Sequence, residues 1–419
     1  MRYTAVATTL FLSSLLLTPA TALQAQAGHD DEYASGGGHA VEAVQAGLDE
    51  SHGEALQEEH GVAHGQAVHG EEAHGEEAHG ESAHGEEEFE ATEYILEHVS
   101  DSHEWHILTK KNGEHVAVYL PVILYSKQSG LHVFSSKLLA HGHNHDGFEM
   151  GVGTRPVPNK DGELVEKSVK NKIIEVDAHG ELVAAGLPLD FSITKNVFMM
   201  ALATFILLVV FLSLAKSYRK SGISEPKGIQ GFLEPVIEFI EVDVAIPNIG
   251  EHKYERFMPY LLTVFFFILI NNLMGLIPFF PFGANVTGNI ALTMVLALFT
   301  FFMTQFNSNK GHWQHVFLTP GVPKPLLVIM IPVEIIGLFT KPFALMVRLF
   351  ANITAGHIIV LSLISMIFIF KAVFIAVPAG LMVLFMDCIE LLVAFLQAYI
   401  FTLLSALFIG MAMPEHHHD

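Results

Sequence analysis

Arg348 stands inside a run from Leu326 to Phe370 that is otherwise almost wholly apolar and long enough to cross a bilayer. Bringing a guanidinium to the centre of a membrane helix costs about 2.5–3.5 kcal/mol on insertion scales. The guanidinium stays protonated in proteins, so it cannot avoid this cost by losing its charge. Arg348 therefore needs a dedicated partner, and a functional role is the most direct reason for keeping it.

Other polar residues recur at helical spacing in the same run. Glu334, Lys341 and Arg348 are seven residues apart, so on a helix they form one stripe, with Asn352 close to it. This stripe predicts a polar path along one helix face. The alternative is that Glu334 and Lys341 only pair with each other or snorkel toward the membrane surface.

The last apolar run, from about Ala372 to Ala412, carries a second polar set. Glu390 and Gln397 are seven residues apart and share a helix face, and Asp387 joins them three residues earlier. Gln397 could instead serve only as a hydrogen bond between helices. For Asp387, solvation near a helix end is an equally good explanation.

Folding the two runs into an antiparallel hairpin brings their polar residues together in two layers. Arg348 then lies at the depth of Gln397, and His357 at the depth of Glu390, because both pairs share one centre near the turn. Nine residues of helix separate Arg348 from His357, or about 13 Å. A hydrogen-bonded buried histidine without a further role remains the alternative for His357.

These residues lie in motifs that resemble one family. The segment Arg348–His357 closely resembles the signature of subunit a of the F-type ATP synthase, and so does Glu390–Phe401. Lys341-Pro342 and the segment Asn272–Pro278 match the same family. The resemblance covers Val197 to Met413 and is specific as a combined pattern.

The resemblance implies a non-catalytic stator that faces a rotating ring of c subunits, each with a membrane-buried carboxylate. It implies two aqueous half-channels that do not meet. The ion that flows through them is expected to be H⁺ in preference to Na⁺, and its flow is converted into rotation and ATP synthesis. The implied partners are the c-ring, the b subunits of the peripheral stalk and the lipid bilayer. No cofactor and no nucleic acid are expected.

The resemblance also implies roles for single residues. Arg348 resembles the arginine that keeps the passing ring carboxylate deprotonated, and Gln397 resembles its companion on the facing helix. His357 and Glu390 resemble the proton-handling pair of the periplasmic half-channel, whose acid and histidine are exchanged in some relatives.

Four further polar residues receive weaker assignments. Glu334 matches an acidic residue of the cytoplasmic half-channel, and Asn352 and Asn272 are expected to line the proton path. Asp387 has no counterpart in the family pattern, and tuning of proton uptake is its candidate role.

Composition indicates a multi-pass membrane protein with extramembrane parts, since 51% of the 419 residues are hydrophobic and the mean hydropathy is +0.42. The net charge of −22 is concentrated near the N-terminus, because no Lys or Arg occurs between Arg2 and Lys110. Residues 1–27 resemble a secretory signal, with an apolar core over Thr4–Leu17 and a small-residue cleavage site ending at Ala27. The alternative is an uncleaved membrane-anchoring start.

Residues 28–90 form an acidic, low-complexity tail that we expect to be disordered. His-Gly units recur with a period of five, which matches neither a helix face nor a strand. A solvated tail is the preferred interpretation and no metal site is assigned, although His-rich tracts can bind Zn²⁺ or Cu²⁺. The weak metal candidates are His64, His69, His74, His79 and His84.

Residues 91–190 are expected to form a small periplasmic domain rich in β-strands. Strand-like runs cover Val116–Tyr125, Leu131–Phe134 and Lys172–Val176. Turns are indicated at Asn112-Gly113, Ser129-Gly130 and Asp161-Gly162. Six histidines of this region could form a metal site, but we prefer to interpret them as surface residues without a metal. They are His98, His103, His106, His141, His143 and His145.

Residues 191–419 are expected to form an all-α polytopic membrane domain with five membrane helices. A first span covers Val197–Ala215, and two spans with an external turn fill Phe257–Asn309. Two overlong helices follow, over about Leu326–Phe370 and about Ala372–Ala412, and Val377–Gly380 lies near the turn between them. The stretch Gly231–Ile249 carries four acids and is expected to lie along the membrane surface.

Lysines and arginines after the first span place that end in the cytoplasm by the positive-inside rule. The chain is then an inner-membrane protein of a two-membrane bacterium, with a periplasmic N-terminus and a cytoplasmic C-terminus. A secondary transporter is the first alternative function, but no internal repeat is visible and the number of spans is odd. A His-rich metal receptor with a membrane anchor leaves Arg348 unexplained.

Overall fold

The computed structural model describes residues 91–413 except for eight short segments. These segments are residues 110–114, 159–163, 178–181, 183–186, 222–227, 278–279, 318–323 and 371–372. The expected signal sequence and the His-rich tail lie outside the described residues, as do the turns expected at Asn112-Gly113 and Asp161-Gly162.

The predicted β-rich domain is confirmed. It begins with helix α3 (Ala91–Val99) and contains a 3₁₀ helix, η2 (Ser136–Gly142). Its antiparallel strands pair as β1-β2, β4-β3-β9, β5-β8 and β6-β7. Their bounds are β1 Glu104–Thr109, β2 His115–Tyr119, β3 Pro121–Ser126, β4 Gly130–Ser135, β5 Phe148–Met150, β6 Thr154–Pro158, β7 Leu164–Ser168, β8 Ile173–Glu175 and β9 Leu189–Asp190.

The strand expected over Val116–Tyr125 is divided at Leu120 into β2 and β3. Pro121 explains the break, because proline has no N–H for a ladder bond and is confined to places such as the first residue of a strand. Along β3 every second side chain is buried, and Val122 and Leu124 pack against Phe148. This alternation is what a half-buried sheet requires.

His103 was expected at the surface of the domain, but its side chain is buried, so this prediction is wrong. Its Nε2 lies 3.0 Å from Oδ2 of Asp190, on β9. Burial raises the pKa of the Asp190 carboxyl, but the hydrogen bond and charge of His103, together with bonds from Ser192, bring it below its ordinary value. A partner 87 residues away in sequence made this burial possible.

Helices dominate the described residues after β9. They are α4 (Lys195–Ser221), α5 (Ile229–Phe239), a π-helix η3 (Ile240–Ala245), α6 (Ile246–Ile249), α7 (Tyr254–Gly275), α8 (Ile290–Phe306), α9 (Lys310–Phe317), α10 (Lys324–Phe370) and α11 (Val373–Met411). Four of the described helices, α4, α7, α10 and α11, are long and apolar enough to cross a membrane. The remaining expected span, α8, is shorter and has 17 residues. Asn289 caps its N-terminus, where its side chain accepts a hydrogen bond from the Ala291 N–H.

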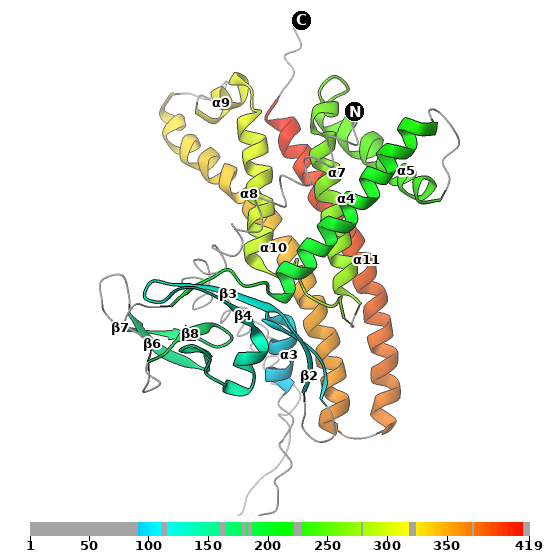
Figure 1. Cartoon of the computed structure of the whole chain (residues 1–419). Coiled ribbons are helices and arrows are strands. Elements are labelled where there is room, and N and C mark those ends of the chain that lie inside the picture. The colour runs from blue at the N-terminus through cyan, green and yellow to red at the C-terminus, as the bar shows by residue number, and fades with distance from the viewer. Residues whose placement is uncertain are drawn as a thin grey trace, which may run out of the picture. The chain divides into compact units, whose positions relative to one another are not determined.

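The last two helices form the predicted overlong hairpin, and α10 and α11 run side by side (Figure 1). They have 47 and 39 residues, so each is about twice the length that a span requires. Helix α10 ends at Phe370 and α11 begins at Val373, where the two apolar runs placed the turn, and Val377–Gly380 lies close after it, inside α11. Pro378 sits in the second turn of the helix, where its missing N–H removes a single bond, to the Phe374 carbonyl.

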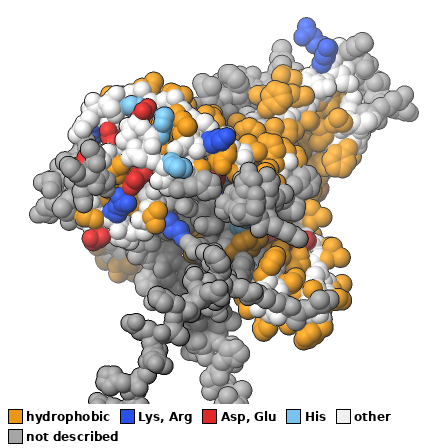
Figure 2. Space-filling model, turned by 60° about the horizontal axis from the view of Figure 1, so that its bottom comes forward, with side chains coloured by type: hydrophobic (Ala, Val, Ile, Leu, Met, Phe, Trp, Pro, Cys, Tyr) orange, Lys and Arg blue, Asp and Glu red, His pale blue; other side chains and the backbone are white. Residues whose placement is uncertain are grey.

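Exposure differs sharply between the helices. In the most apolar stretch of α7, 83% of the residues are buried by the chain itself, against 11% in α10 and 17% in α11. Figure 2 shows the outcome at the surface, where hydrophobic side chains cover the visible helices and charged and histidine side chains gather on the β-rich domain. The hairpin therefore presents a large apolar surface to lipid or to another protein.

One glycine allows α11 to contact the short helix α6. A Cβ at Gly410 would overlap the backbone carbonyl oxygen of Asn248. We expect Gly410→Ala to push α6 away and to destabilise the protein by about 1–3 kcal/mol, the usual cost of overpacking. Thermal unfolding of the purified protein in detergent measures the loss.

Gly380, on the same helix, provides the control for Gly410. Nothing lies within 4 Å of a Cβ built there, so Gly380→Ala should leave the unfolding temperature unchanged or raise it slightly. Equal unfolding temperatures for the two variants would contradict the close contact.

Candidate functional site

His357 and Glu390 meet inside the hairpin, as the spacing predicted. Nδ1 of His357, on α10, lies 2.6 Å from Oε1 of Glu390, on α11. Glu390 is only 5% exposed, so this contact is shielded from solvent by the chain itself. The two groups form a close ion pair when the histidine is protonated, although the geometry does not align as a hydrogen bond.

Two glycines lie next to this pair, and one of them, Gly356, provides room for it. A Cβ at Gly356 would lie 3.0 Å from Oε1 of Glu390, so the carboxylate packs where a side chain would otherwise stand. A Cβ at Gly275, on α7, would lie 3.7 Å from Nε2 of His357. Sequence reasoning missed both, although the Gly-His dipeptide at 356–357 was a visible signal of close approach.

Asn272 lies in a buried polar network beside the pair. It is 3% exposed, and its Nδ2 donates to the Ala394 carbonyl of α11 at 3.1 Å. Its Oδ1 accepts from the Thr287 hydroxyl at 2.6 Å. Asn272 therefore joins α7, α11 and the loop before α8, because its amide nitrogen and its amide oxygen each bond a different segment.

Arg348 lies on the exposed side of α10 and forms no hydrogen bond or ion pair with any residue in the described part of the chain. Gln397 is 5% exposed on α11, and no hydrogen bond joins it to Arg348 there. Asn352 and Asp387 are exposed. Around Arg348 the exposed side of α10 carries mostly small or branched side chains, namely Ala344, Val347, Ala351, Asn352, Ala355 and Ile359.

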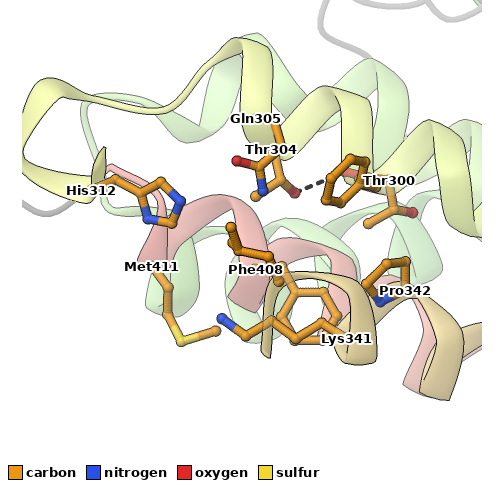
Figure 3. Close-up of a pocket in the computed structure, with 10 residues that line it drawn as sticks. Thr300, Thr304, Gln305, His312, Lys341, Pro342, Phe408 and Met411 are labelled. Carbon is orange, nitrogen blue, oxygen red and sulfur yellow. Dashed lines mark hydrogen bonds between the residues drawn. The ribbon is translucent and has the colours of Figure 1, made fainter. Parts of the chain in front are cut away.

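Lys341 makes a contact that its spacing alone did not predict. Its ammonium lies 5.8 Å from the centre of the Phe408 ring of α11, a cation–π contact, whereas Arg348 is exposed. Figure 3 shows Lys341 and Phe408 together in a small hollow lined by residues of α8, α9, α10 and α11. Glu334, seven residues before Lys341, is half-buried on α10.

A chain of buried hydroxyl groups next to this hollow was not anticipated. The hydroxyls of Tyr260 and Thr300 lie 2.7 Å apart, and those of Thr300 and Ser405 3.2 Å apart. The three residues come from α7, α8 and α11. Threonine and serine in membrane helices commonly make such bonds between helices, which is why their spacing alone gave no signal.

Metal binding has no structural support in the part of the chain that is described. No group of three or more His, Cys, Asp or Glu side chains is placed to hold an ion there. The His-Gly units, from His64 to His84, lie outside the described residues.

The fold and the site define a multi-pass helical membrane protein whose last two helices form an overlong polar hairpin. The ATP synthase A chain family matches residues 197–410, which is more than half of the chain. The chain therefore belongs to the ATP synthase subunit a family, as the sequence motifs indicated. A domain of unknown function matches residues 94–191.

Several relatives are similar over most of their own length. The ATP synthase subunit a of Chloroherpeton thalassium is 52% identical over 233 residues, which cover 55% of this chain and 69% of the relative. The ATP synthase subunit a 2 of Chlorobaculum tepidum is 48% identical over 274 residues, 62% of this chain and 76% of the relative. The subunit a of an Anaeromyxobacter species is 45% identical over 262 residues, 59% and 62% of the two chains.

Proposed function

We propose that this chain is the proton-conducting stator of an F-type ATP synthase, coupling proton flow to rotation of a c-ring and so to ATP synthesis. The observation that carries the proposal is the position of Arg348. It is a permanent cation on the uncovered side of an apolar helix, with no acid of its own described chain beside it. Because such a charge is costly in lipid, it calls for an acidic partner, which none of the described residues supplies.

The surroundings of Arg348 suit a moving acidic partner. Ala344, Ala351 and Ala355 lie on the same exposed side, and small residues let another helix come close in a membrane. At an effective dielectric constant near 20, opposite charges about 4 Å apart attract by roughly 4 kcal/mol. This corresponds to about three pKa units, enough to deprotonate a ring carboxylate whose pKa burial has raised.

His357 and Glu390 are assigned to proton transfer in the periplasmic half-channel. The nine residues between Arg348 and His357 correspond to about 13 Å along α10, so the pair and the arginine act at different depths. Arg348 blocks a direct proton path between the half-channels. The supporting roles go to Gln397 beside the arginine, Asn352 and Asn272 along the path, Glu334 in the cytoplasmic half-channel and Asp387 in proton uptake.

The chain itself performs no bond chemistry in this proposal. A potential of 100 mV supplies about 2.3 kcal/mol per proton, so several protons must pass for each ATP. The c-ring, the peripheral-stalk b subunits and lipid are the partners. We place the protein in the bacterial inner membrane, with a cleaved signal (1–27), an exported tail (28–90) and domain (91–190), and a cytoplasmic C-terminus.

Photo-crosslinking tests the contact with the ring. A benzophenone maleimide on Asn352→Cys, in a Cys388→Ser background, should crosslink the assembled complex to a small two-helix proteolipid. The control is Phe205→Cys on α4, whose side chain is 63% exposed on a helix outside the hairpin. Equal crosslinking from both positions, or none from position 352, would reject the assigned face.

A further inference from the structure

The loop between α7 and α8 is bonded to the helices that carry the His357–Glu390 pair. The Thr354 hydroxyl of α10 lies 3.5 Å from the Gly288 carbonyl oxygen of the loop. The Thr287 hydroxyl reaches Asn272, whose amide is bonded to α11. The loop residues Ala284, Asn285, Val286 and Thr287 are at most 3% exposed.

The same loop and His357 both lie beside Gly275 of α7. The Ala284 carbonyl oxygen lies 3.3 Å from the place where a Cβ of Gly275 would stand, and Nε2 of His357 lies 3.7 Å from that place. The loop and the imidazole therefore pack beside the same residue of α7. A shift of the loop would reach His357 through this part of α7.

Trp105 of the β-rich domain holds the start of this loop. Its indole N–H donates to the Phe282 carbonyl oxygen at 3.1 Å, and the side chain is 7% exposed. The ring makes edge-to-face contacts with Phe280 of the loop and with Phe198 of α4, at centroid distances of 5.6 and 5.8 Å. Such aromatic pairs stabilise beyond the area they bury.

Strand β1, which carries Trp105, is itself fixed to the first membrane helix. The Ser102 carbonyl accepts a hydrogen bond from the backbone N–H of Lys195, at the start of α4, at 3.0 Å. His103 is bonded to Asp190, five residues before that helix. Trp105 is thus attached to a rigid base and can restrain the loop.

We propose that Trp105 is a positioning residue for proton transfer: it holds the α7–α8 loop against His357 and thereby fixes the geometry of the His357–Glu390 pair. The domain matched at residues 94–191 then has a role in the membrane site, as the clamp on its exported side. This inference rests on the proposed function of the pair. It differs from a purely structural role because its effect passes through Glu390.

Two measurements on the complete ATP synthase test the proposal. The first is hydrogen–deuterium exchange of residues 280–289, where the Gly283 amide is bonded to the Met274 carbonyl. The second is the initial rate of ATP-driven proton pumping in vesicles. The variants are Trp105→Ala, Trp105→Phe, which keeps the ring contacts without the N–H, and Val133→Ala as a control in the same domain, at a side chain 64% exposed.

Trp105→Ala should increase exchange in the loop and lower the pumping rate, each on the order of fivefold, the effect of losing about one net hydrogen bond. Trp105→Phe should recover part of both, and Val133→Ala should change neither. In a Glu390→Gln background, Trp105→Ala should lower the remaining rate less than twofold, because the two residues act in series.

The possible outcomes separate the inference from the function on which it rests. If Trp105→Ala leaves hydrogen–deuterium exchange of the loop unchanged, the inference is overturned. It is also overturned if Trp105→Ala speeds exchange of the loop but pumps at the normal rate, while Glu390→Gln pumps slowly. An equal loss from Trp105→Ala with and without Glu390 also overturns it, since a general folding defect then explains the result. If Glu390→Gln pumps at the normal rate, the proposed role of the His357–Glu390 pair is refuted, and the inference about Trp105 is refuted with it.

Discussion

Replacing Arg348 with alanine should abolish ATP-driven proton pumping while the complex still assembles. The guanidinium lies on the exposed side of α10 and is bonded to no described residue of its own chain, so its removal breaks no internal contact. A ring carboxylate at this position would lose about 4 kcal/mol of attraction and keep its proton. Acidification of vesicles, measured by fluorescence quenching, should fall to background.

Val347→Ala is the matched control for Arg348→Ala. Val347 is the neighbouring residue on α10 and is 37% exposed. Its replacement by alanine removes apolar area without changing the charge. Its pumping should stay within about twofold of the original rate, because surface substitutions usually change stability by no more than about 0.5 kcal/mol. Coupled pumping by Arg348→Ala at a normal rate would refute the mechanism.

Replacing Glu390 with glutamine should slow proton uptake by about 100-fold, at the lower end of what a positioned acid–base group contributes to proton transfer. The substitution keeps the size of the side chain, so the space beside Gly356 stays filled. What is lost is a group that can release and bind a proton 2.6 Å from His357. The rate of pumping in vesicles measures the effect.

Exchanging the two residues gives a sharper test of the pair. His357→Glu combined with Glu390→His keeps an acid and a histidine opposite each other at one depth of the hairpin. The double variant should pump faster than Glu390→Gln, since the proton can again pass between the two groups. Equal rates in the original protein and in all these variants would exclude the pair from the proton path.

The membrane helices and the pairing of the hairpin could be predicted from sequence because both depend on local patterns. Apolar runs define the spans, and the shared centre of two polar pairs predicted that His357 meets Glu390, which the 2.6 Å contact confirms. The same runs placed the turn, since α10 ends at Phe370 and α11 begins at Val373. Pro378 lies close after that turn, inside α11, although proline usually interrupts helices. Near the start of α11 the loss of one backbone bond was tolerated.

The sequence by itself determined the family, the spans and the polar residues of the last two helices, since charges in an apolar run are visible without a fold. Only the tertiary structure decided which of those residues face inward. Lys341 contacts the Phe408 ring while Arg348 stays exposed, because the packing of neighbouring helices decides which side chains of one helix face are covered. The bond from Trp105 to Phe282 joins residues 177 positions apart, and no local pattern encodes a contact of that separation.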